Sequence, residues 1–317
     1  MALLEVQNLS IGYQTAKGML QAVEDVSFGV DAGQSLGLVG ESGCGKTTIG
    51  MALMGLLPKN GSITAGRVLL DGVDMRGLDE EQQRAMRWRD IAMIFQAAMN
   101  ALNPVQKVGD QIAEAILTHR PELGKDEVYQ QVEGLYQLVG LPVGRMRDYP
   151  HQYSGGMKQR AVIAMALALN PKVIIADEPT TALDVIVQDQ ILKETRELQR
   201  EFNIAIIFIS HDISIVSEVC QMIGVMYAGQ LVERGTVEEV FRNPLHPYTQ
   251  ALLNSFPALG GPRKALRPIP GEPPLLIGRL SGCRFCDRCP RGEAVCKLQP
   301  PELKQFSPSH FVRCDNC

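Results

Sequence analysis

A glycine-rich segment between an apolar run and a helical pattern constrains the fold of this chain more than any other feature. Residues 40–47 read Gly-Glu-Ser-Gly-Cys-Gly-Lys-Thr and fit the pattern G-x-x-x-x-G-K-[ST]. The pattern has meaning only where a buried strand leads into the loop and a helix follows it. Leu36–Val39 has the composition of such a strand, and residues 46–57 have the periodicity of a helix. A glycine-rich turn that matched by chance would lack both neighbours, so the segment predicts a phosphate-binding loop in an α/β fold.

The chemistry of this loop explains its spacing. Glycines let the backbone turn so that successive N–H groups face phosphate oxygens, and the positive end of the following helix dipole adds to the attraction. Lys46 can reach the β- and γ-phosphates of a nucleotide, and the Thr47 hydroxyl can ligate Mg²⁺. We expect a bound nucleotide to contact Gly40, Ser42, Gly43, Cys44, Gly45, Lys46, Thr47 and Thr48.

Strand and helix patterns alternate through much of the chain. Helical periodicity is found in residues 46–57, 108–119, 126–138, 156–169 and 187–202. Apolar runs bounded by turn residues predict buried strands at Leu36–Val39, Val68–Leu70, Ile91–Phe95, Val173–Ala176 and Ile204–Ile209. Because strands that alternate with helices usually run parallel, we predict a parallel-strand core.

Three regions depart from this alternation. Leu3–Leu9 and Val23–Val30 predict strands joined by turns, which would form an antiparallel addition. Residues from about 105 to 165 have no strand pattern and predict a helical insert. The stretch 257–282 is rich in Pro and Gly and predicts an irregular connector. We therefore expect a body over residues 1–256, a connector over 257–282 and a separate tail over 283–317.

Polar residues that follow predicted strands are candidates for catalysis. Asp177 and Glu178 follow Val173–Ala176, and side chains at the carboxyl ends of parallel strands point into the ligand crevice of an α/β sheet. Asp177 suits a Mg²⁺ partner, and Glu178 is placed to polarise an attacking water. His211 could contact the γ-phosphate, and Gln96 could contact Mg²⁺ or the water. Solvated carboxylates and a structural histidine are the alternatives, but the phosphate loop makes them poorer interpretations.

The composition separates the tail from the body. Of the 8 cysteines, six lie at Cys283, Cys286, Cys289, Cys296, Cys314 and Cys317. From Pro257 onward there are 10 Lys/Arg and 5 Asp/Glu, whereas the body has 21 and 30. The net charge of −4 gives no overall basic field for nucleic acid. The longest apolar run, residues 161–169, is too short to span a bilayer, and the first residues lack a signal-peptide pattern, so we expect a cytosolic location.

The order of the motifs resembles that of the ABC-transporter ATPases. A Ser-Gly-Gly-Met-Lys-Gln-Arg segment at residues 154–160 lies just before a predicted helix. The resemblance covers residues 1 to about 240, and its parts occur in the order Tyr13, the phosphate loop, Gln96, Ser154-Gly155-Gly156, Asp177-Glu178, Ala182-Leu183-Asp184 and His211. The segment departs from the commoner Leu-Ser-Gly-Gly-Gln form at Tyr153 and Met157.

This resemblance implies a mechanism. Two such domains would pair head to tail around two ATP molecules, and Ser154, Gly155 and Gly156 would face the nucleotide held by the partner's loop. Such a turn at a helix N-terminus is suited to an anion. Tyr13 would stack on adenine, and Asp184 would couple the two sites. Because the phosphate contact would use the serine hydroxyl and the glycine backbones, we expect the departures at Tyr153 and Met157 to leave function intact. The presence of both Glu178 and His211 implies that the site can hydrolyse ATP.

Further segments narrow the resemblance to the ATP-binding subunits of oligopeptide/dipeptide permeases. These are residues 102–104, 226–235, 243–253 and 269–274, together with the pattern of Cys283, Cys289, Cys296, His310 and Cys314 in the tail. The branch implies a prokaryotic importer with an extracytoplasmic substrate-binding protein, two integral membrane subunits and usually two different ATPase chains. The chain would lie peripherally on the cytoplasmic face of the membrane. The region from Gln96 to about Asp148 would carry the groove for the coupling helices of the membrane subunits.

Other functions remain open at this point. Substrates of the branch include peptides, but also nickel chelates and oligosaccharides. A soluble ABC protein acting on DNA or ribosomes would usually have paired ATPase domains or long coiled coils, and this chain has one phosphate loop and no heptad run. An exporter ATPase would not carry the permease-like tail.

The cysteines of the tail predict a bound metal, since disulfides are disfavoured in a reducing cytosol. Zn²⁺ could be held by two C-x-x-C pairs, Cys283 with Cys286 and Cys314 with Cys317. A [4Fe–4S] cluster could be held by Cys283, Cys289, Cys296 and Cys314, and the resemblance supports this set. We expect a structural metal module because a tail this short cannot build a core of its own. A redox-sensing role is the alternative.

Overall fold

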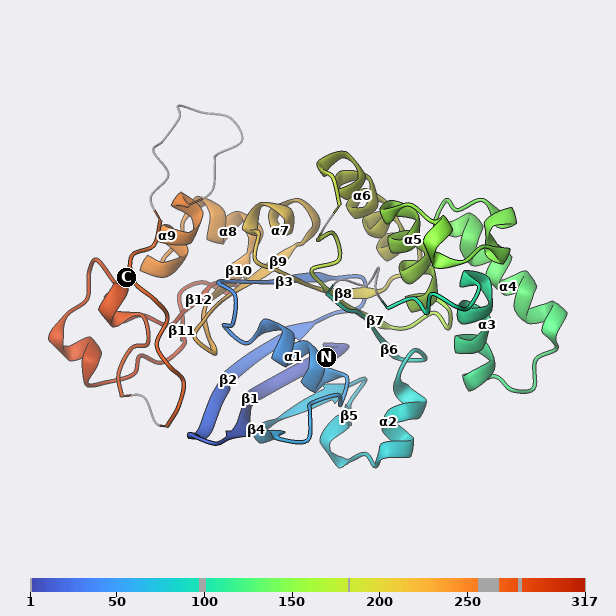
Figure 1. Cartoon of the computed structure of the whole chain (residues 1–317). Helices are drawn as coiled ribbons and strands as arrows, with labels where there is room; N and C mark the ends of the chain where they lie inside the picture. The colour runs from blue at the N-terminus through green and yellow to red at the C-terminus, as the bar shows by residue number, and fades with distance from the viewer. Residues whose placement is uncertain (1, 97–100, 182, 256–267, 279–280, 317) are drawn as a thin grey trace. The chain divides into compact units, whose positions relative to one another are not determined.

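The computed structural model describes residues 2–96, 101–181, 183–255, 268–278 and 281–316 (Figure 1). Two compact units make up the chain. The first comprises Met1–Val30, Ser35–Arg76 and Phe208–Cys317, and the second comprises Asp31–Gln34 and Gly77–Ile207. Ala182 and Cys317, which belong to two of the expected motifs, lie outside the described residues, as does half of the expected connector.

An antiparallel sheet forms the amino-terminal part of the first unit, as predicted. Its strand order is β2-β1-β4-β5, where β1 is Leu4–Thr15, β2 is Gly18–Val30, β4 is Gly61–Leu70 and β5 is Val73–Asp74. Val68–Leu70, expected among the core strands, is instead the end of β4 and pairs antiparallel with β1. An apolar run alone does not distinguish a half-buried antiparallel strand from a fully buried parallel one, which is why this prediction was wrong.

The second sheet of the first unit carries the phosphate loop. Its strand β3 (Ser35–Val39) runs parallel to β9 (Met222–Tyr227), which pairs antiparallel with β10 (Gln230–Thr236). Beyond β10 come two short tail strands, β12 (Phe311–Val312) and β11 (Lys304–Gln305). Figure 1 shows helices α7 (Ile213–Val219) and α8 (Val237–Arg242) on one face of these strands and the antiparallel sheet on the other. Every residue of β3 is buried, as its apolar run predicted.

Helix α1 (Lys46–Leu53) follows the loop and is shorter than expected. The apolar pattern predicted a helix to residue 57, but Gly55 adopts a left-handed φ of 63°. The N–H of Leu56 reaches back to the carbonyl of Met51 across 2.8 Å, which closes the helix at its C-terminus. The remaining helix of the first unit is α9 (Pro247–Asn254), in which Pro247 occupies the first turn.

The second unit contains parallel strands and the helical insert. Strands β6 (Ile91–Ile94) and β7 (Val173–Asp177) pair in parallel, with Ile91 opposite Val173. The chain passes from this unit into the first within β8 (Ala205–Ser210). The helices are α2 (Glu80–Met86), α3 (Val108–His119), α4 (Lys125–Leu138), α5 (Gly155–Ala166) and α6 (Val185–Glu201), with 3-10 turns η3 (Val143–Arg147) and η4 (Pro150–Gln152).

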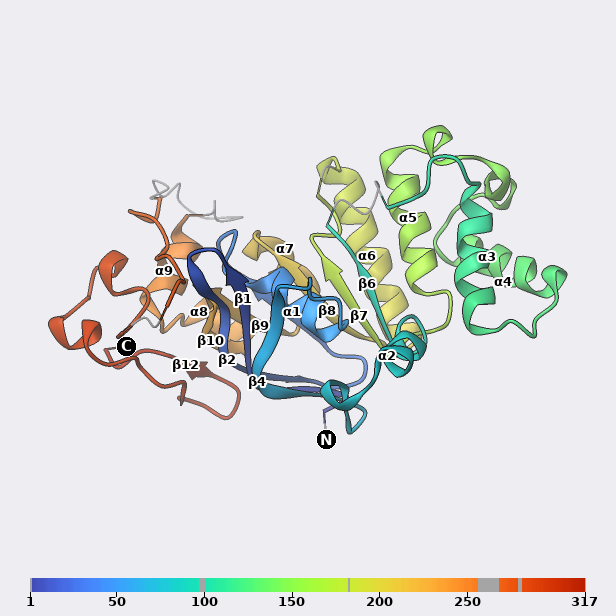
Figure 2. The same cartoon turned by 60° about the horizontal axis from the view of Figure 1, so that its bottom comes forward.

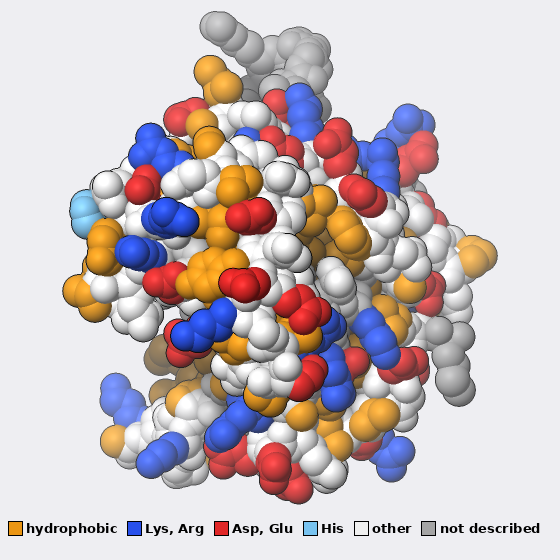
Figure 3. Space-filling model, turned by 90° about the vertical axis from the view of Figure 1, so that its right-hand side faces the viewer, with side chains coloured by type: hydrophobic (Ala, Val, Ile, Leu, Met, Phe, Trp, Pro, Cys, Tyr) orange, Lys and Arg blue, Asp and Glu red, His pale blue; other side chains and the backbone are white. Residues whose placement is uncertain are grey.

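Helices α3, α4 and α5 pack against one another (Figures 1 and 2). No strand occurs between residue 101 and residue 165, all of which the structure describes, so the predicted helical insert is confirmed there. Figure 3 looks onto the side that carries α3 and α4, where Lys/Arg and Asp/Glu side chains are interspersed with apolar ones. This mixture of charge on the insert accords with the small net charge of the chain.

The tail has little regular structure. In residues 281–316 the structure places 3-10 turns η5 (Cys286–Arg288) and η6 (Ala294–Lys297) and the strands β11 and β12. In the described part of the expected connector, residues 268–278 and 281–282, one isolated bridge joins Ile277 to Leu20. Among the residues described, no helix is both long enough and apolar enough to cross a membrane.

Candidate functional site

The phosphate loop connects β3 to α1, as its sequence pattern requires. Gly40, Gly43 and Gly45 have φ values of 151°, 78° and 102°, which L side chains rarely adopt. Gly40 has no room for a side chain in addition, because a Cβ there would lie 2.1 Å from the carbonyl oxygen of Met226. The glycines therefore serve both the turn and the close approach of the loop to β9.

Lys46 turns its side chain back along the loop. Its Nζ donates to the carbonyl oxygen of Gly40 at 2.7 Å and to that of Glu41 at 3.0 Å, and the residue is buried. Burial also raises the pKa of the Cys44 thiol, although the neighbouring Lys46 opposes this, so Cys44 stays neutral near pH 7. The loop thus holds a buried positive charge at its centre.

Tyr13 lies on β1 and its hydroxyl is 3.4 Å from the Oγ1 of Thr48 in the first turn of α1. Gly61 makes space for the ring, since a Cβ at that position would lie 2.6 Å from a ring carbon of Tyr13. The structure therefore brings Tyr13 to the helix that begins at the loop. Stacking of Tyr13 on adenine stays a prediction.

Gln96 and Glu178 come together in the second unit. The Nε2 of Gln96 donates to the Glu178 carboxylate at 2.8 Å, and the Thr181 hydroxyl donates to the same oxygen at 3.1 Å. Glu178 has a φ of 47°, an uncommon conformation for a residue other than glycine and one that recurs at functional sites. Asp177, the last residue of β7, is buried. The sequence predicted Gln96, Asp177 and Glu178 as site residues, but it predicted neither their contact nor the part played by Thr181.

Ser154 and Asp184 each cap a helix of the second unit. The Ser154 hydroxyl accepts from the N–H of Met157 at the start of α5, and Gly155 and Gly156 form its first turn. Gly156 faces Val187 of α6, where a Cβ would approach to 2.9 Å. Asp184 accepts from the N–H of Val187 at the start of α6. Both caps follow the usual preference for Ser and Asp at helix N-termini.

Tyr153 has a structural reason for replacing leucine before Ser154. Its ring is buried, and its hydroxyl donates to the carbonyl oxygen of Arg145 at 2.8 Å. The same hydroxyl lies 2.7 Å from that of Tyr136 on α4. The substitution therefore keeps an apolar ring in the insert and satisfies its polar end.

The sequence-predicted residues are divided between the two units. The loop, Tyr13 and His211 belong to the first, and Gln96, Asp177, Glu178 and Ser154–Gly156 belong to the second. His211 is exposed directly after β8, and the next residue, Asp212, caps α7. Within the units, the structure joins Tyr13 to Thr48 and Gln96 to Glu178.

The tail cysteines converge on one pocket. Its lining includes the five residues Cys283, Cys286, Cys289, Cys296 and Cys314, together with Phe285 and His246. Burial raises the pKa of Cys283, Cys286 and Cys289, so these thiols stay protonated near pH 7 unless a cation is bound. Among the residues described, no group of three or more His, Cys, Asp or Glu is arranged to hold a metal ion. The expected metal module is therefore not demonstrated, although its soft sulfur donors line a common space.

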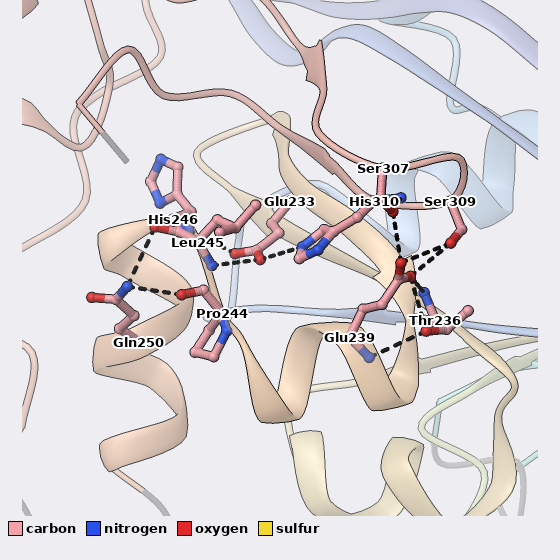
Figure 4. A network of polar contacts seen from close by, with 10 residues as sticks. All are labelled: Glu233, Thr236, Glu239, Pro244, Leu245, His246, Gln250, Ser307, Ser309 and His310. Atoms are coloured by element: carbon pink, nitrogen blue, oxygen red, sulfur yellow. Dashed lines mark hydrogen bonds and ion pairs between the residues drawn. The ribbon is translucent and has the colours of Figure 1, made fainter.

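The carboxylates of Glu233 and Glu239 attach the tail to the rest of the first unit (Figure 4). Glu233 of β10 is fully buried and accepts from the N–H groups of Leu245 and His246, and it pairs with His310 of the tail at 2.7 Å. Glu239 of α8 accepts from the hydroxyls of Ser307 and Ser309. These contacts were not predicted, because no local pattern links residues so distant in sequence.

Known protein families match both the body and the tail. The family model of the ABC transporter matches residues 23–181. The model of the oligopeptide/dipeptide transporter C-terminal region matches residues 232–296. Among solved structures, the chain is similar to the dimeric ATP-binding cassette MJ0796 bound to ADP and Pi, with a TM-score of 0.66 and 25% identity. That match covers 74% of this chain and 98% of the other.

Curated relatives match over nearly the full length. The dipeptide transport ATP-binding protein DppD of Bacillus subtilis is 45% identical over 314 residues, which cover 98% of this chain and 93% of that protein. The oligopeptide transport ATP-binding protein OppD of Escherichia coli is 44% identical over 315 residues, with 99% and 93% covered. The phosphate loop, the Gln96–Glu178 contact and these similarities agree, and the chain belongs to the ABC transporter family of ATP-binding proteins, in the oligopeptide/dipeptide branch.

Proposed function

We propose that this chain is the ATP-hydrolysing subunit that drives a peptide importer. The observation that carries the proposal is the pairing of Gln96 with Glu178 at the end of β7, in a chain that also has an intact phosphate loop. The relatives named for dipeptide and oligopeptide transport support peptides as the cargo. Nickel chelates and oligosaccharides are the other cargoes that a transport assay would test.

We assign a separate role in ATP hydrolysis to each of the site residues. The loop and Lys46 hold the phosphates, and Thr47, Gln96 and Asp177 are the proposed partners of Mg²⁺. The Glu178 carboxylate, held by the Gln96 amide, polarises a water that attacks the γ-phosphorus. The bond from that phosphorus to the β–γ bridging oxygen breaks, and ADP and phosphate leave. His211 contacts the γ-phosphate.

The proposed assembly contains more than this chain. A second ATPase subunit, usually a different chain in such importers, pairs head to tail with it, and Ser154, Gly155 and Gly156 contact the partner's nucleotide. The similarity to a dimeric ATP-binding cassette supports this pairing. Two integral membrane permease subunits dock on residues 96–148, and a substrate-binding protein outside the membrane delivers cargo to them. The chain then lies peripherally on the cytoplasmic face, without a nucleic-acid partner.

The tail is proposed to be a metal module of residues 283–317, joined by residues 257–282 to an ATPase domain of residues 1–256. The thiols that line one pocket support a [4Fe–4S] cluster on Cys283, Cys289, Cys296 and Cys314. When bound, the cluster would cross-link four separate segments of the tail. Zn²⁺ is the alternative, and it would use Cys286 with Cys283.

The test of hydrolysis is Glu178→Gln. This variant should bind ATP, accumulate as an ATP-bound dimer with its partner ATPase and lose turnover, and unchanged turnover would refute the role of Glu178. Reconstitution with the membrane subunits and the substrate-binding protein, supplied with labelled peptides, nickel chelates or oligosaccharides, identifies the cargo. Anaerobic purification with iron, sulfide and zinc assays, and absorbance at ~400 nm, distinguishes cluster from zinc.

A further inference from the structure

An arginine of the cysteine-rich tail makes a two-pronged contact with the phosphate loop. The Nη1 of Arg288 lies 2.7 Å from one carboxylate oxygen of Glu41, and its Nη2 lies 2.9 Å from the other. Glu41 is the second residue of the loop, and 247 positions separate it from Arg288. The Arg288 side chain is 7% exposed and that of Glu41 is 26% exposed. Paired, charge-assisted bonds of this geometry are among the stronger contacts of protein side chains.

Neighbouring groups fix both partners. The Nε of Arg288 donates to the carbonyl oxygen of Pro270 at 2.8 Å, and its Nη1 also donates to the Tyr227 hydroxyl at 3.2 Å. The guanidinium carbon lies 5.6 Å from the centre of the Tyr227 ring. On the loop side, the N–H of Glu41 donates to the Tyr248 hydroxyl at 3.0 Å. Glu41, in the first turn of the loop, is therefore held in place both by its backbone N–H and by its side chain.

The charge of Glu41 needs such a partner. The loop is suited to the negative phosphates of ATP, and Glu41 is its acidic residue. An ionised carboxylate so close in sequence to the phosphate-binding N–H groups would repel the ligand, and the repulsion would be strong because the region is partly buried. Arg288 supplies the compensating positive charge from the tail, and Lys46 remains to meet the phosphates.

We propose that Arg288 is a positioning residue for nucleotide binding, which neutralises and orients Glu41 so that the ATP affinity of the loop depends on the cysteine-rich tail. This proposal rests on the proposed binding of ATP at the loop. It adds a residue that lies outside the ATPase motifs to the residues on which binding depends. The position of Arg288 in the chain explains how the tail could affect ATP affinity. Arg288 ends η5 and lies directly before Cys289, so the segment that lines the thiol pocket also carries the contact with Glu41.

A second arginine of the tail provides a matched control. The Arg313 side chain is also 7% exposed, and it forms an ion pair with Asp25 of β2 at 3.0 Å. Arg313 therefore attaches the tail to the same unit with comparable burial, but it does not contact the loop through this pair. Loss of Arg313 tests attachment of the tail, whereas loss of Arg288 tests attachment and the charge of Glu41 together.

The experiment is a double-mutant cycle on the full-length chain, with Mg²⁺ and the non-hydrolysable analogue AMP-PNP titrated by calorimetry. Arg288→Met should weaken binding about tenfold in the natural background and less than about threefold in a Glu41→Gln background. Arg313→Met should change affinity less than about twofold. If Arg288→Met does not fold, Arg288→Lys can replace it, because lysine keeps the positive charge but cannot form both hydrogen bonds at once. Arg288→Lys should lower the affinity less than Arg288→Met, and this decrease should disappear in the Glu41→Gln background.

Two results would overturn the proposal. An equal loss from Arg288→Met in the natural and in the Glu41→Gln background would mean that the arginine does not act through the carboxylate. An unchanged affinity of Arg288→Met in the natural background would mean that the loop does not depend on the contact. An unmodified chain that failed to bind AMP-PNP would refute the nucleotide site itself, which separates that failure from a failure of the coupling.

Discussion

The side-chain amide of Gln96 donates to the Glu178 carboxylate across 2.8 Å, and the Thr181 hydroxyl donates to the same oxygen. Glu178 directly follows β7 and has a left-handed backbone conformation. The orientation of its side chain therefore depends on Gln96 and Thr181 as well as on the strand. A group that polarises water must be aimed as well as charged. We therefore propose that Gln96, in addition to its proposed contact with Mg²⁺, orients the Glu178 carboxylate.

Gln96→Ala should lower the kcat of ATP hydrolysis by about one to two orders of magnitude, because the carboxylate loses its orienting donor. Adding Gln96→Ala to Glu178→Gln should lower the rate little further, since the two residues act as a unit. Steady-state phosphate release measures both effects. Gln190→Ala, at an exposed position of α6, is the control and should turn over normally. Additive losses in the double variant would contradict the shared role.

Tyr153→Phe should destabilise the helical insert by about 1 to 2 kcal/mol, because the Arg145 carbonyl and the Tyr136 hydroxyl lose a buried partner. Urea denaturation measures this through the transition midpoint. Tyr136→Phe leaves the bond between Tyr153 and Arg145 in place and should therefore cost less. A Tyr153→Phe chain as stable as the natural one would show that water replaces the lost hydroxyl.

Local patterns predicted the parts of the site whose geometry is itself local. The loop follows from its glycines, and the helix expected just after Ser154 begins there as α5. The hairpin of β9 and β10 was not predicted, because Glu233 interrupts the apolar pattern of β10 although it is fully buried. The carboxylate is tolerated there because His310 and two backbone N–H groups satisfy it. The partners of Glu233 lie 77 and about a dozen positions away in the sequence, so no local periodicity could predict them.

The contacts of the tail were unpredictable for the same reason. Composition marked residues 283–317 as a distinct segment, and the thiols do line one pocket. Composition contains no information on which arginine of the tail meets which carboxylate of the body. Arg288 with Glu41 and Arg313 with Asp25 are pairings that only the folded chain defines.

Glu239 should make stability depend on pH in the acid range. Burial raises its pKa, but hydrogen bonds from Ser307, Thr236 and Ser309 outweigh this and lower the pKa to about 2 from an ordinary value of 4.5. A depressed carboxyl pKa means that the unfolded chain binds the proton more readily. The stabilisation from Glu239 is therefore fully present above pH 4.5 and is lost as the pH falls from 4.5 toward about 2.

The variant Glu239→Gln should flatten this part of the stability profile. Chemical denaturation at a series of pH values should give an unfolding free energy that falls less steeply below pH 4.5 than in the natural chain. Glu238→Gln, at the neighbouring position, should leave the slope unchanged, because its side chain is largely exposed. Parallel slopes for Glu239→Gln and the natural chain would mean that the serine contacts do not persist in solution.

The ligand set of the tail can be resolved by comparing two cysteines that line the same pocket. Cys289 belongs to the proposed cluster set and Cys286 does not, whereas a zinc site would use Cys286. Cys289→Ser should therefore abolish anaerobically bound iron and sulfide, and Cys286→Ser should retain both. Cys220→Ser, outside the tail, controls for the loss of a buried thiol. The opposite result, with zinc lost from Cys286→Ser and kept by Cys289→Ser, would assign the pocket to zinc.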